Sequence, residues 1–277
     1  MRRSSSYPWT YVESMVAGMR ARNDFDQVHT YCMFIGQPRS GTSLIGSIMN
    51  AHRQMLIAQE LNALRYVVRG YGKNQLYWLL KMKDQEFAAD GRRWTGYQYE
   101  VPNQWQSKTD RPFVIGDKKA GLSSEIIAKH PDVLERLQQL VKVPIKIVHI
   151  VRNPFNVITT IHRKRSRTPL ELAASMYFGR CQTNWQLMQE RPDVVKTIRL
   201  EDMIAQPYSH LAELCSHVGV DCPDDYAEDC SSILFAKPRQ SQKDIVWPQT
   251  ILDQVTDEMQ KYPFLDGYTA DAMKAAA

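Results

Sequence analysis

Cysteine is scarce in this chain, and the few thiols show no pairing pattern. The 277 residues include five cysteines, with no C-x-x-C pair and no Cys/His spacing typical of a zinc site. An odd number at irregular spacing argues against a disulfide framework, so we expect reduced thiols and no metal centre. The five are Cys32, Cys181, Cys215, Cys222 and Cys230.

Long apolar runs are absent as well. No stretch approaches the ~20 apolar residues that a membrane-spanning helix needs, and the N-terminus lacks the continuous apolar core of a secretion signal. We therefore expect a soluble, cytoplasmic protein with a single domain over residues 1–277, in which residues 1–30 form a helical extension packed on it. Four apolar residues of this extension share one helical face, which we also expect to pack on the domain. They are Val12, Met15, Val16 and Met19.

Charge of one sign is not concentrated in any long run. The formal net charge is +5, and the hydrophobic and charged fractions, 43% and 23%, are those of an ordinary globular protein. The basic residues are scattered and no nucleic-acid-binding motif accompanies them, so we expect no nucleic-acid partner. An anionic small molecule fits the mild positive balance better.

Apolar, β-rich segments alternate with segments of helical periodicity. This order is typical of an α/β domain in which helices flank a mostly parallel β-sheet. The expected strands cover 31–36, 112–116, 145–151 and 195–200. The expected helices cover 42–51, 74–83, 122–129, 131–140, 154–164, 169–189, 206–218 and 249–261.

The most informative segment is Tyr31–Ser43, YCMFIGQPRSGTS, where an apolar strand passes through a glycine-containing loop into a helix. This order predicts a phosphate cradle, because the loop N–H groups and those of the first helical turn converge at the positive end of the helix dipole. A Walker loop, G-x-x-x-x-G-K-[ST], would carry lysine where Thr42 stands, whereas here the cation is Arg39 within the loop. The segment therefore predicts a P-loop-type nucleotide-binding domain that is poorly equipped to bridge outer phosphates with Mg²⁺.

The loop P-R-S-G-T-S resembles the 5′-phosphosulfate loop of sulfotransferases that use 3′-phosphoadenosine 5′-phosphosulfate (PAPS). In that family, an arginine at a strand end and a serine eight positions later bind the 3′-phosphate. Arg152 follows the expected strand 145–151, and Thr160 stands eight residues later with the same hydroxyl donor. The resemblance implies that PAPS is the cosubstrate, with 5′-phosphosulfate ligands Pro38, Arg39, Ser40, Gly41, Thr42 and Ser43.

Two later segments extend the resemblance. Val195–Tyr208 is similar to the family's V-x-Y-E-D-L-x-x-x-P stretch, although Leu200 stands in place of the tyrosine. We expect Glu201 and Asp202 to cap the helix that follows. In the family a late basic loop closes over the nucleotide, and its candidates here are Lys237 and Arg239.

Sulfuryl transfer needs a base for the acceptor proton and cations beside the leaving group. The cytosolic small-molecule branch of the family uses a histidine near a lysine-containing segment, but the corresponding Val114–Gly121 contains none. The tyrosylprotein sulfotransferase branch uses a glutamate, and Glu60 falls in its place, so we expect Glu60 as the base if burial raises its affinity for a proton. His52 is the rival base. Lys118 resembles the family's lysine beside the scissile bond, and the adjacent Lys119 is not distinguished from it.

The implied reaction is in-line transfer of a sulfuryl group from PAPS to a hydroxyl, with Arg39 and Lys118 offsetting charge on the bridging oxygen. The acceptor stays open between a small-molecule, a carbohydrate and a peptide hydroxyl, and an amine is not excluded. Residues 66–105 are rich in aromatic side chains that can line an acceptor groove or fill the core. Two alternatives remain, a P-loop nucleotide kinase or phosphotransferase and a catalytically silent nucleotide-binding module, and a homodimer is compatible with each.

Overall fold

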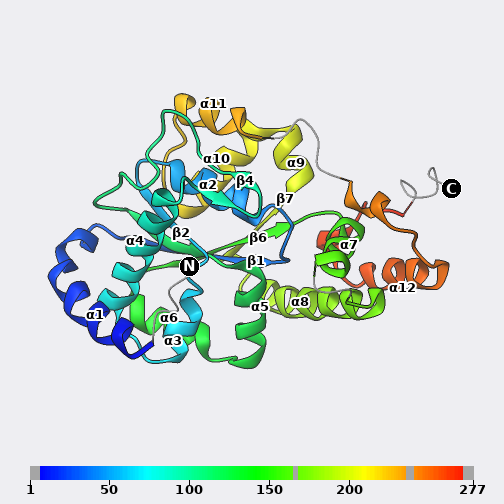
Figure 1. Ribbon diagram of the computed structural model, residues 1–277, viewed down its shortest axis with the longest axis horizontal. Helices are drawn as coiled ribbons and strands as arrows, with labels where there is room; N and C mark the ends of the chain where they lie inside the picture. Colours follow the sequence, from blue (N-terminus) through cyan, green and yellow to red (C-terminus); the bar gives the residue numbers. More distant parts are fainter. Residues whose placement is uncertain (1–6, 165–167, 235–239, 271–277) are drawn as a thin grey trace.

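Five parallel strands form the central sheet of the structure, a computed structural model that describes residues 7–164, 168–234 and 240–270 (Figure 1). The strand order is β2–β5–β1–β6–β7, so the first strand lies in the centre, β2 forms one edge before β5 fills the place beside β1, and β6 and β7 extend the sheet to the other edge. This architecture confirms the predicted α/β class with a mostly parallel sheet. The strands are β1 (Thr30–Gly36), β2 (Met55–Gln59), β5 (Val114–Lys118), β6 (Ile145–Val151) and β7 (Val195–Arg199).

Helices surround this sheet and a two-stranded hairpin projects from it. The α-helices are α1 (Tyr7–Arg20), α2 (Thr42–Ala51), α3 (Ala63–Val68), α4 (Lys73–Ala89), α5 (Ala120–Lys129), α6 (Val133–Val141), α7 (Pro154–Lys164), α8 (Leu170–Glu190), α9 (Leu200–Ala205), α10 (Pro207–Val218), α11 (Asp224–Ser232) and α12 (Gln249–Met259). Three short 3₁₀ helices are η1 (Arg22–Phe25), η2 (Ser241–Asp244) and η3 (Pro263–Leu265). The hairpin pairs β3 (Arg93–Trp94) with β4 (Tyr97–Gln98).

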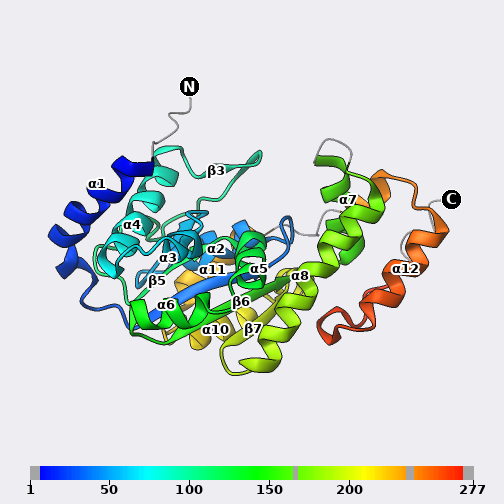
Figure 2. The same cartoon turned by 90° about the horizontal axis from the view of Figure 1, so that it is seen from below.

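The central strand β1 is buried on both faces because its side chains alternate between two cores. Cys32 and Phe34 pack with α2, α10 and α11, which lie above the sheet in Figure 1. Tyr31, Met33 and Ile35 pack on the opposite face with α3, α4 and α6. A third cluster joins α7, α8 and α12 at the far end of the molecule (Figure 2).

The expected elements match the observed ones closely, with some omissions. The expected strand 112–116 begins two residues later in the structure, so that Lys118 is the last residue of β5. The sequence reading missed β2, the β3–β4 hairpin, and the helices α3, α9 and α11. The strand β2 is only five residues long and follows α2 after three residues, so its apolar side chains read as a continuation of the helix.

The helix α1 packs on α4 through its small residues, and the expectation for its apolar stripe is wrong. Ser14 is fully buried, and a Cβ atom on Gly18 would lie 2.6 Å from the carbonyl oxygen of Asn74, so the backbones approach closely there. The stripe faces away from α4 instead. Its exposed fractions are Val12 52%, Met15 41%, Val16 43% and Met19 64%.

Two kinds of feature are absent from the described ranges. No helix there has the length and apolarity needed to cross a membrane. The described His, Cys, Asp and Glu side chains form no group of three or more that could hold a metal ion.

Candidate functional site

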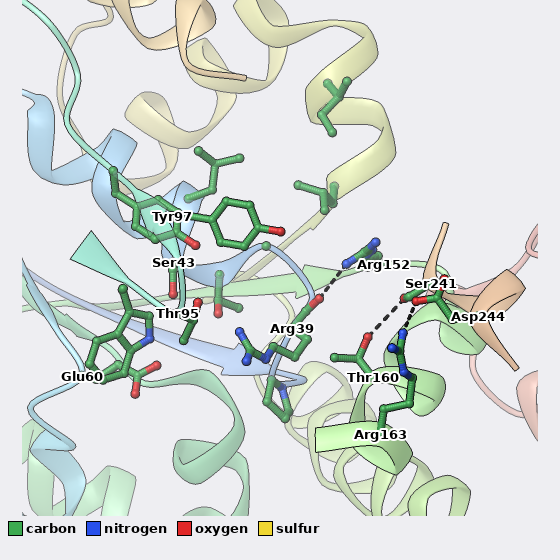
Figure 3. Close-up of a pocket in the computed structure, with 18 residues that line it drawn as sticks. Arg39, Ser43, Glu60, Thr95, Tyr97, Arg152, Thr160, Arg163, Ser241 and Asp244 are labelled. Carbon is green, nitrogen blue, oxygen red and sulfur yellow. Dashed lines mark hydrogen bonds and ion pairs between the residues drawn. The ribbon is translucent and has the colours of Figure 1, made fainter. Parts of the chain in front are cut away.

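A cavity of about 520 Å³ opens at the carboxyl ends of the strands, beside the loop that joins β1 to α2 (Figure 3). Open α/β sheets bind their ligands at this edge. Its lining is cationic and hydroxylated along the loop and along α7, and aromatic along the hairpin. The lining residues are Pro38, Arg39, Gly41, Thr42, Ser43, Leu44, Glu60, Trp94, Thr95, Tyr97, Tyr99, Arg152, Thr160, Arg163, Leu200, Ile204, Ser241 and Asp244.

The loop between β1 and α2 has a backbone that side chains would obstruct. Gly36 has φ +127°, and a Cβ atom there would lie 2.6 Å from the carbonyl oxygen of Ile150. Gly41 has φ +90°, and its Cβ would lie 2.7 Å from Cδ1 of Leu200. Both positions therefore favour glycine. Ser40 is buried and closes the loop by donating to the carbonyl oxygen of Gln37 at 2.7 Å.

The helix α2 begins at this loop without a hydrogen-bonded cap from any described side chain. Its first N–H groups are thus available to an anion, and the helix dipole adds positive potential at the same point. Thr42 and Ser43, in the first turn, line the cavity. The arrangement can bind a phosphate or a sulfate group.

Glu60, Lys118 and Lys119 form one charged cluster at the hairpin end of the cavity. The Nζ atom of Lys118 donates to Glu60 Oε1 at 2.8 Å and to the hydroxyl of Ser43 at 2.9 Å. Lys119 donates to Glu60 Oε2 at 2.5 Å. Lys118 is 1% exposed and its stem lies against Gly46, where a Cβ atom would be 2.6 Å from Lys118 Cγ. The cluster therefore connects the sheet edge to the first turn of α2.

The pKa of Glu60 does not follow the expectation from burial alone. Burial acts to raise it, but the charges and hydrogen bonds of Lys118 and Lys119 outweigh burial and hold the pKa of Glu60 below its usual value. Burial lowers the pKa of Lys118, and the negative charge of Glu60 acts to raise it. Glu60 is therefore ionised at neutral pH, and it binds a proton less tightly than a free carboxylate, so the expected rise in its proton affinity is not observed.

The opposite end of the cavity is lined by Arg152, just before α7, and by Thr160, on α7 (Figure 3). Arg152 Nη1 donates to the carbonyl oxygen of Arg39 at 3.0 Å, so it also supports the loop. Thr160 donates to the carbonyl oxygen of Asn156 at 2.8 Å, and its hydroxyl lies 3.1 Å from that of Ser241. Arg152 and Thr160, eight residues apart in the sequence, thus line the same cavity as Glu60. Arg39 lies between this pair and Glu60.

Glu201 has a different partner from the one expected. It lies in the first turn of α9, but its carboxylate accepts from the N–H of Asn153 at 3.1 Å, just before α7, and from the hydroxyl of Tyr268 at 2.7 Å. It therefore connects the residue after Arg152 to the C-terminal segment. Leu200, the departure from the family's tyrosine, lines the cavity and packs against Gly41.

Most of the chain matches a known protein family. Residues 33–224, well over half of the chain, match the model of a family described as the sulfotransferase family.

The chain belongs to the sulfotransferase family.

Solved sulfotransferase structures are similar to this chain at low sequence identity. Sulfotransferase STF9 from Mycobacterium avium has a TM-score of 0.52 at 8% identity, with 91% of this chain and 81% of that chain covered. The sulfotransferase domain of the Synechococcus PCC 7002 olefin synthase has a TM-score of 0.49 at 17% identity, covering 90% and 94%. Mouse sulfotransferase SULT7A1 complexed with PAP has 0.48 at 13%, covering 97% and 95%. A search of curated protein sequences finds no significant match.

The structure separates His52 from the other candidate site residues. His52 follows the C-terminal end of α2, whose N-terminal end lines the cavity, and it is 1% exposed. Its Nδ1 accepts from the N–H of Gln54 at 3.1 Å, and its Nε2 lies 3.0 Å from the carbonyl oxygen of Asp221. Burial lowers its pKa. These contacts leave His52 as a residue of the protein interior. Lys237 and Arg239, the candidates for the closing loop, lie outside the described residues.

The sequence reading missed the hairpin as part of the site. Of the nine aromatic residues between 66 and 105, four are buried, namely Tyr71, Tyr77, Phe87 and Tyr99. Trp94, Tyr97 and the buried Tyr99 line the cavity from β3, β4 and the residue after β4. The turn between the strands is Thr95-Gly96, both with positive φ, a pair typical of two-residue hairpins. Gly96 between two aromatic residues was the available signal.

Asp117 was also missed, and it holds the segment that contains Glu60. It is buried in β5 next to Lys118, and it accepts from the N–H groups of Leu61 at 2.9 Å and Ala63 at 2.8 Å. The segment that it holds includes Glu60, which has φ +60°. Burial raises the pKa of Asp117 to about 6.

We expect Asp117→Ala to lower the free energy of unfolding by about 2–4 kcal/mol, because two backbone donors lose their acceptor. Asp117→Asn, as the matched variant, should also change the pH dependence. The pKa of Asp117 in the folded protein lies above its value near 3.9 in the unfolded chain. The stabilisation that protonated Asp117 gives the wild type is therefore lost as the pH rises from about 4 to about 6. Urea titrations across this range should show a shallower loss for Asp117→Asn, and parallel curves would contradict the assignment.

Proposed function

We propose that this sulfotransferase-family protein transfers a sulfuryl group from PAPS to a hydroxyl acceptor, with Glu60 as the base. One observation carries the proposal. A single cavity has a cationic loop and helix N-terminus in the middle, a carboxylate–lysine cluster at one end and an arginine with a hydroxyl at the other. The cationic middle and the arginine end match a donor that carries phosphates at two positions. The carboxylate end matches an acceptor that loses a proton.

The residues present fit PAPS on structural grounds. The first N–H groups of α2 have no described side-chain cap, and they face the cavity beside the loop. Arg39, Thr42 and Ser43 would hold the 5′-phosphosulfate there, and Arg152 with Thr160 would hold the 3′-phosphate. PAPS supplies the activated sulfuryl group, bonded to a phosphate oxygen that leaves readily.

The chain's own residues then handle a proton and a growing negative charge. Glu60 accepts the proton of the acceptor hydroxyl as that oxygen bonds to sulfur. The sulfur–oxygen bond to the 5′-phosphate breaks at the same time, and 3′-phosphoadenosine 5′-phosphate (PAP) leaves. Lys118 and Arg39 offset the charge that develops on the departing oxygen. Of the two lysines, we assign this role to Lys118, because its Nζ reaches Ser43 at 2.9 Å in the phosphosulfate loop.

The acceptor reaches Glu60 past the hairpin. The four lining residues that this segment contributes are three aromatics, Trp94, Tyr97 and Tyr99, and one threonine, Thr95. A surface of this kind favours an acceptor with an apolar or ring-bearing body, since aromatic faces stack on rings and polar contacts are few. We therefore propose a small hydroxyl compound of this character rather than an acidic peptide.

A transfer assay tests the proposal. The protein is incubated with ³⁵S-labelled PAPS and a panel of hydroxyl compounds that contains a simple phenol, a hydroxysteroid, a monosaccharide and an acidic tyrosine peptide. Labelled product with the phenol or the steroid, formed without added Mg²⁺, supports the proposal. Calorimetry in parallel compares PAP with ATP–Mg²⁺. Tighter binding of ATP–Mg²⁺ would favour the phosphotransferase alternative, and tight PAP binding without any transfer would favour the silent module.

A further inference from the structure

The first helix carries an apolar face that the domain leaves uncovered. Eleven large hydrophobic side chains are exposed in the described part of the chain, and five of them lie on α1. Such clustering is unusual on a monomer and marks an interaction surface. The five are Tyr11 (40% exposed), Val12, Met15, Val16 and Met19.

The helix is held firmly on its other side, so this face is presented outward. Gln75 of α4 donates to the carbonyl oxygen of Tyr11 at 3.1 Å and to the hydroxyl of Ser14 at 3.4 Å. With Gly18, these contacts place the small-residue side of α1 against α4. Figures 1 and 2 show α1 at the edge of the molecule in both views, far from α12. The apolar face is thus rigid and accessible.

The spacing of the face suits another helix. Val12 and Val16 lie four residues apart, as do Met15 and Met19, and Val12 and Met15 lie three apart. This spacing gives a stripe along one side of the helix. Stripes of this spacing pack against a second stripe of the same kind by interlocking side chains. A second copy of the same chain offers the matching surface.

Charge selects the direction of such a pair. Glu13 and Arg20 are seven residues apart, nearly two turns, so both lie on the same flank of the stripe. In an antiparallel pair related by a two-fold axis, each flank meets the same flank of the second copy. If Met15 opposes Val16, then Val12 opposes Met19, and Glu13 lies about 3 Å along the axis from Arg20 of the second copy. A parallel pair would not bring these charges together.

We propose that the protein forms a symmetric homodimer through antiparallel packing of α1 against α1 of a second copy. The contact joins the stripes over Met15 and Val16 and two Glu13–Arg20 ion pairs at its rim. One helix from each copy buries less than the roughly 800 Å² per partner of a standard interface. The dimer is therefore weak, with a dissociation constant of about 10–100 µM.

Sedimentation velocity of the full chain from about 1 to 300 µM tests this inference. The mass should rise from that of the 32.0 kDa monomer towards twice that value. Met15→Glu should abolish the rise, because the substituted carboxylates face each other near the two-fold axis. The matched control is Leu172→Glu, which changes a side chain on α8 that is 52% exposed and should leave the dimer intact. Circular dichroism and thermal unfolding establish that both variants fold.

Charge exchange tests the antiparallel arrangement. Glu13→Arg and Arg20→Glu should each weaken the dimer several-fold, and the double variant should restore it. A monomer at all concentrations would overturn the proposal, as would a dimer that Met15→Glu leaves unchanged or a charge pair that shows no restoration. The same proteins are mixed with phosphatidylcholine–phosphatidylglycerol vesicles. A chain that stays monomeric and binds these vesicles through the stripe would assign the face to a lipid surface instead.

Discussion

Glu60→Gln is expected to lower kcat for sulfuryl transfer about 10²–10⁴-fold, the contribution typical of a positioned general base. Glutamine keeps the shape of the side chain and a hydrogen-bond acceptor for Lys118, but it cannot accept a proton at neutral pH. The negative charge that offsets Lys118 and Lys119 is lost as well. The site becomes more cationic, so PAP should bind as tightly as before or more tightly. Rates from the labelled-PAPS assay and calorimetry with PAP measure the two effects separately.

The pH profile provides a second readout of the same residue. Because the lysines hold the pKa of Glu60 below its usual value near 4.5, the carboxylate is ionised throughout the neutral range. The acid limb of kcat should therefore lie below about pH 4.5, in contrast to the limb near pH 6–7 of an enzyme with a histidine base. Glu60→Asp, which retains the carboxylate one methylene further back, should lie between the wild type and Glu60→Gln. More than a tenth of the activity in Glu60→Gln would place the base elsewhere.

The position of the loop in the cavity could be predicted because the loop is defined locally. Strand, loop and helix follow one another directly in Tyr31–Ser43, so a linear motif defines both the residues and their three-dimensional arrangement. The position of Arg152 could be predicted for a related reason, since parallel strands place their carboxyl ends at one edge of the sheet. The pairing of β1 with β6 brings Gly36 opposite Ile150 and therefore the loop next to Arg152.

Other features of the structure depend on contacts between residues that are far apart in the sequence. The pKa of Glu60 is lowered by two lysines 58 and 59 residues away in the chain, whereas burial alone predicted a rise. His52 was the rival base, but it lies beyond the far end of α2 and is engaged on both ring nitrogens. The stripe on α1 shows the same limit. Its periodicity predicts a helix, but the small residues Ser14 and Gly18 decide which side packs.

Arg152→Ala is expected to weaken the binding of PAP by about 10–150-fold, which corresponds to the loss of a charge-assisted hydrogen bond worth about 1.5–3 kcal/mol. AMP, which lacks the 3′-phosphate, provides the comparison. Arg152 also donates to the carbonyl oxygen of Arg39, so the variant should weaken AMP to a smaller extent through the loop. The selective loss for PAP over AMP, measured by calorimetry, is the quantity that reports the 3′-phosphate contact.

Two further variants separate the role of Arg152 in the loop from its role toward the ligand. Arg152→Lys keeps the charge but not the fork of donors, so it should recover part of the preference for PAP and lose the bidentate contact. Thr160→Val removes one hydroxyl without a change in charge, and a several-fold loss confined to PAP is expected because that hydroxyl lies in the same cavity. Equal losses for PAP and AMP in Arg152→Ala would mean that Arg152 acts only as a support for Arg39. The 3′-phosphate would then bind elsewhere, and the distance of eight residues between Arg152 and Thr160 would carry no functional meaning in this chain.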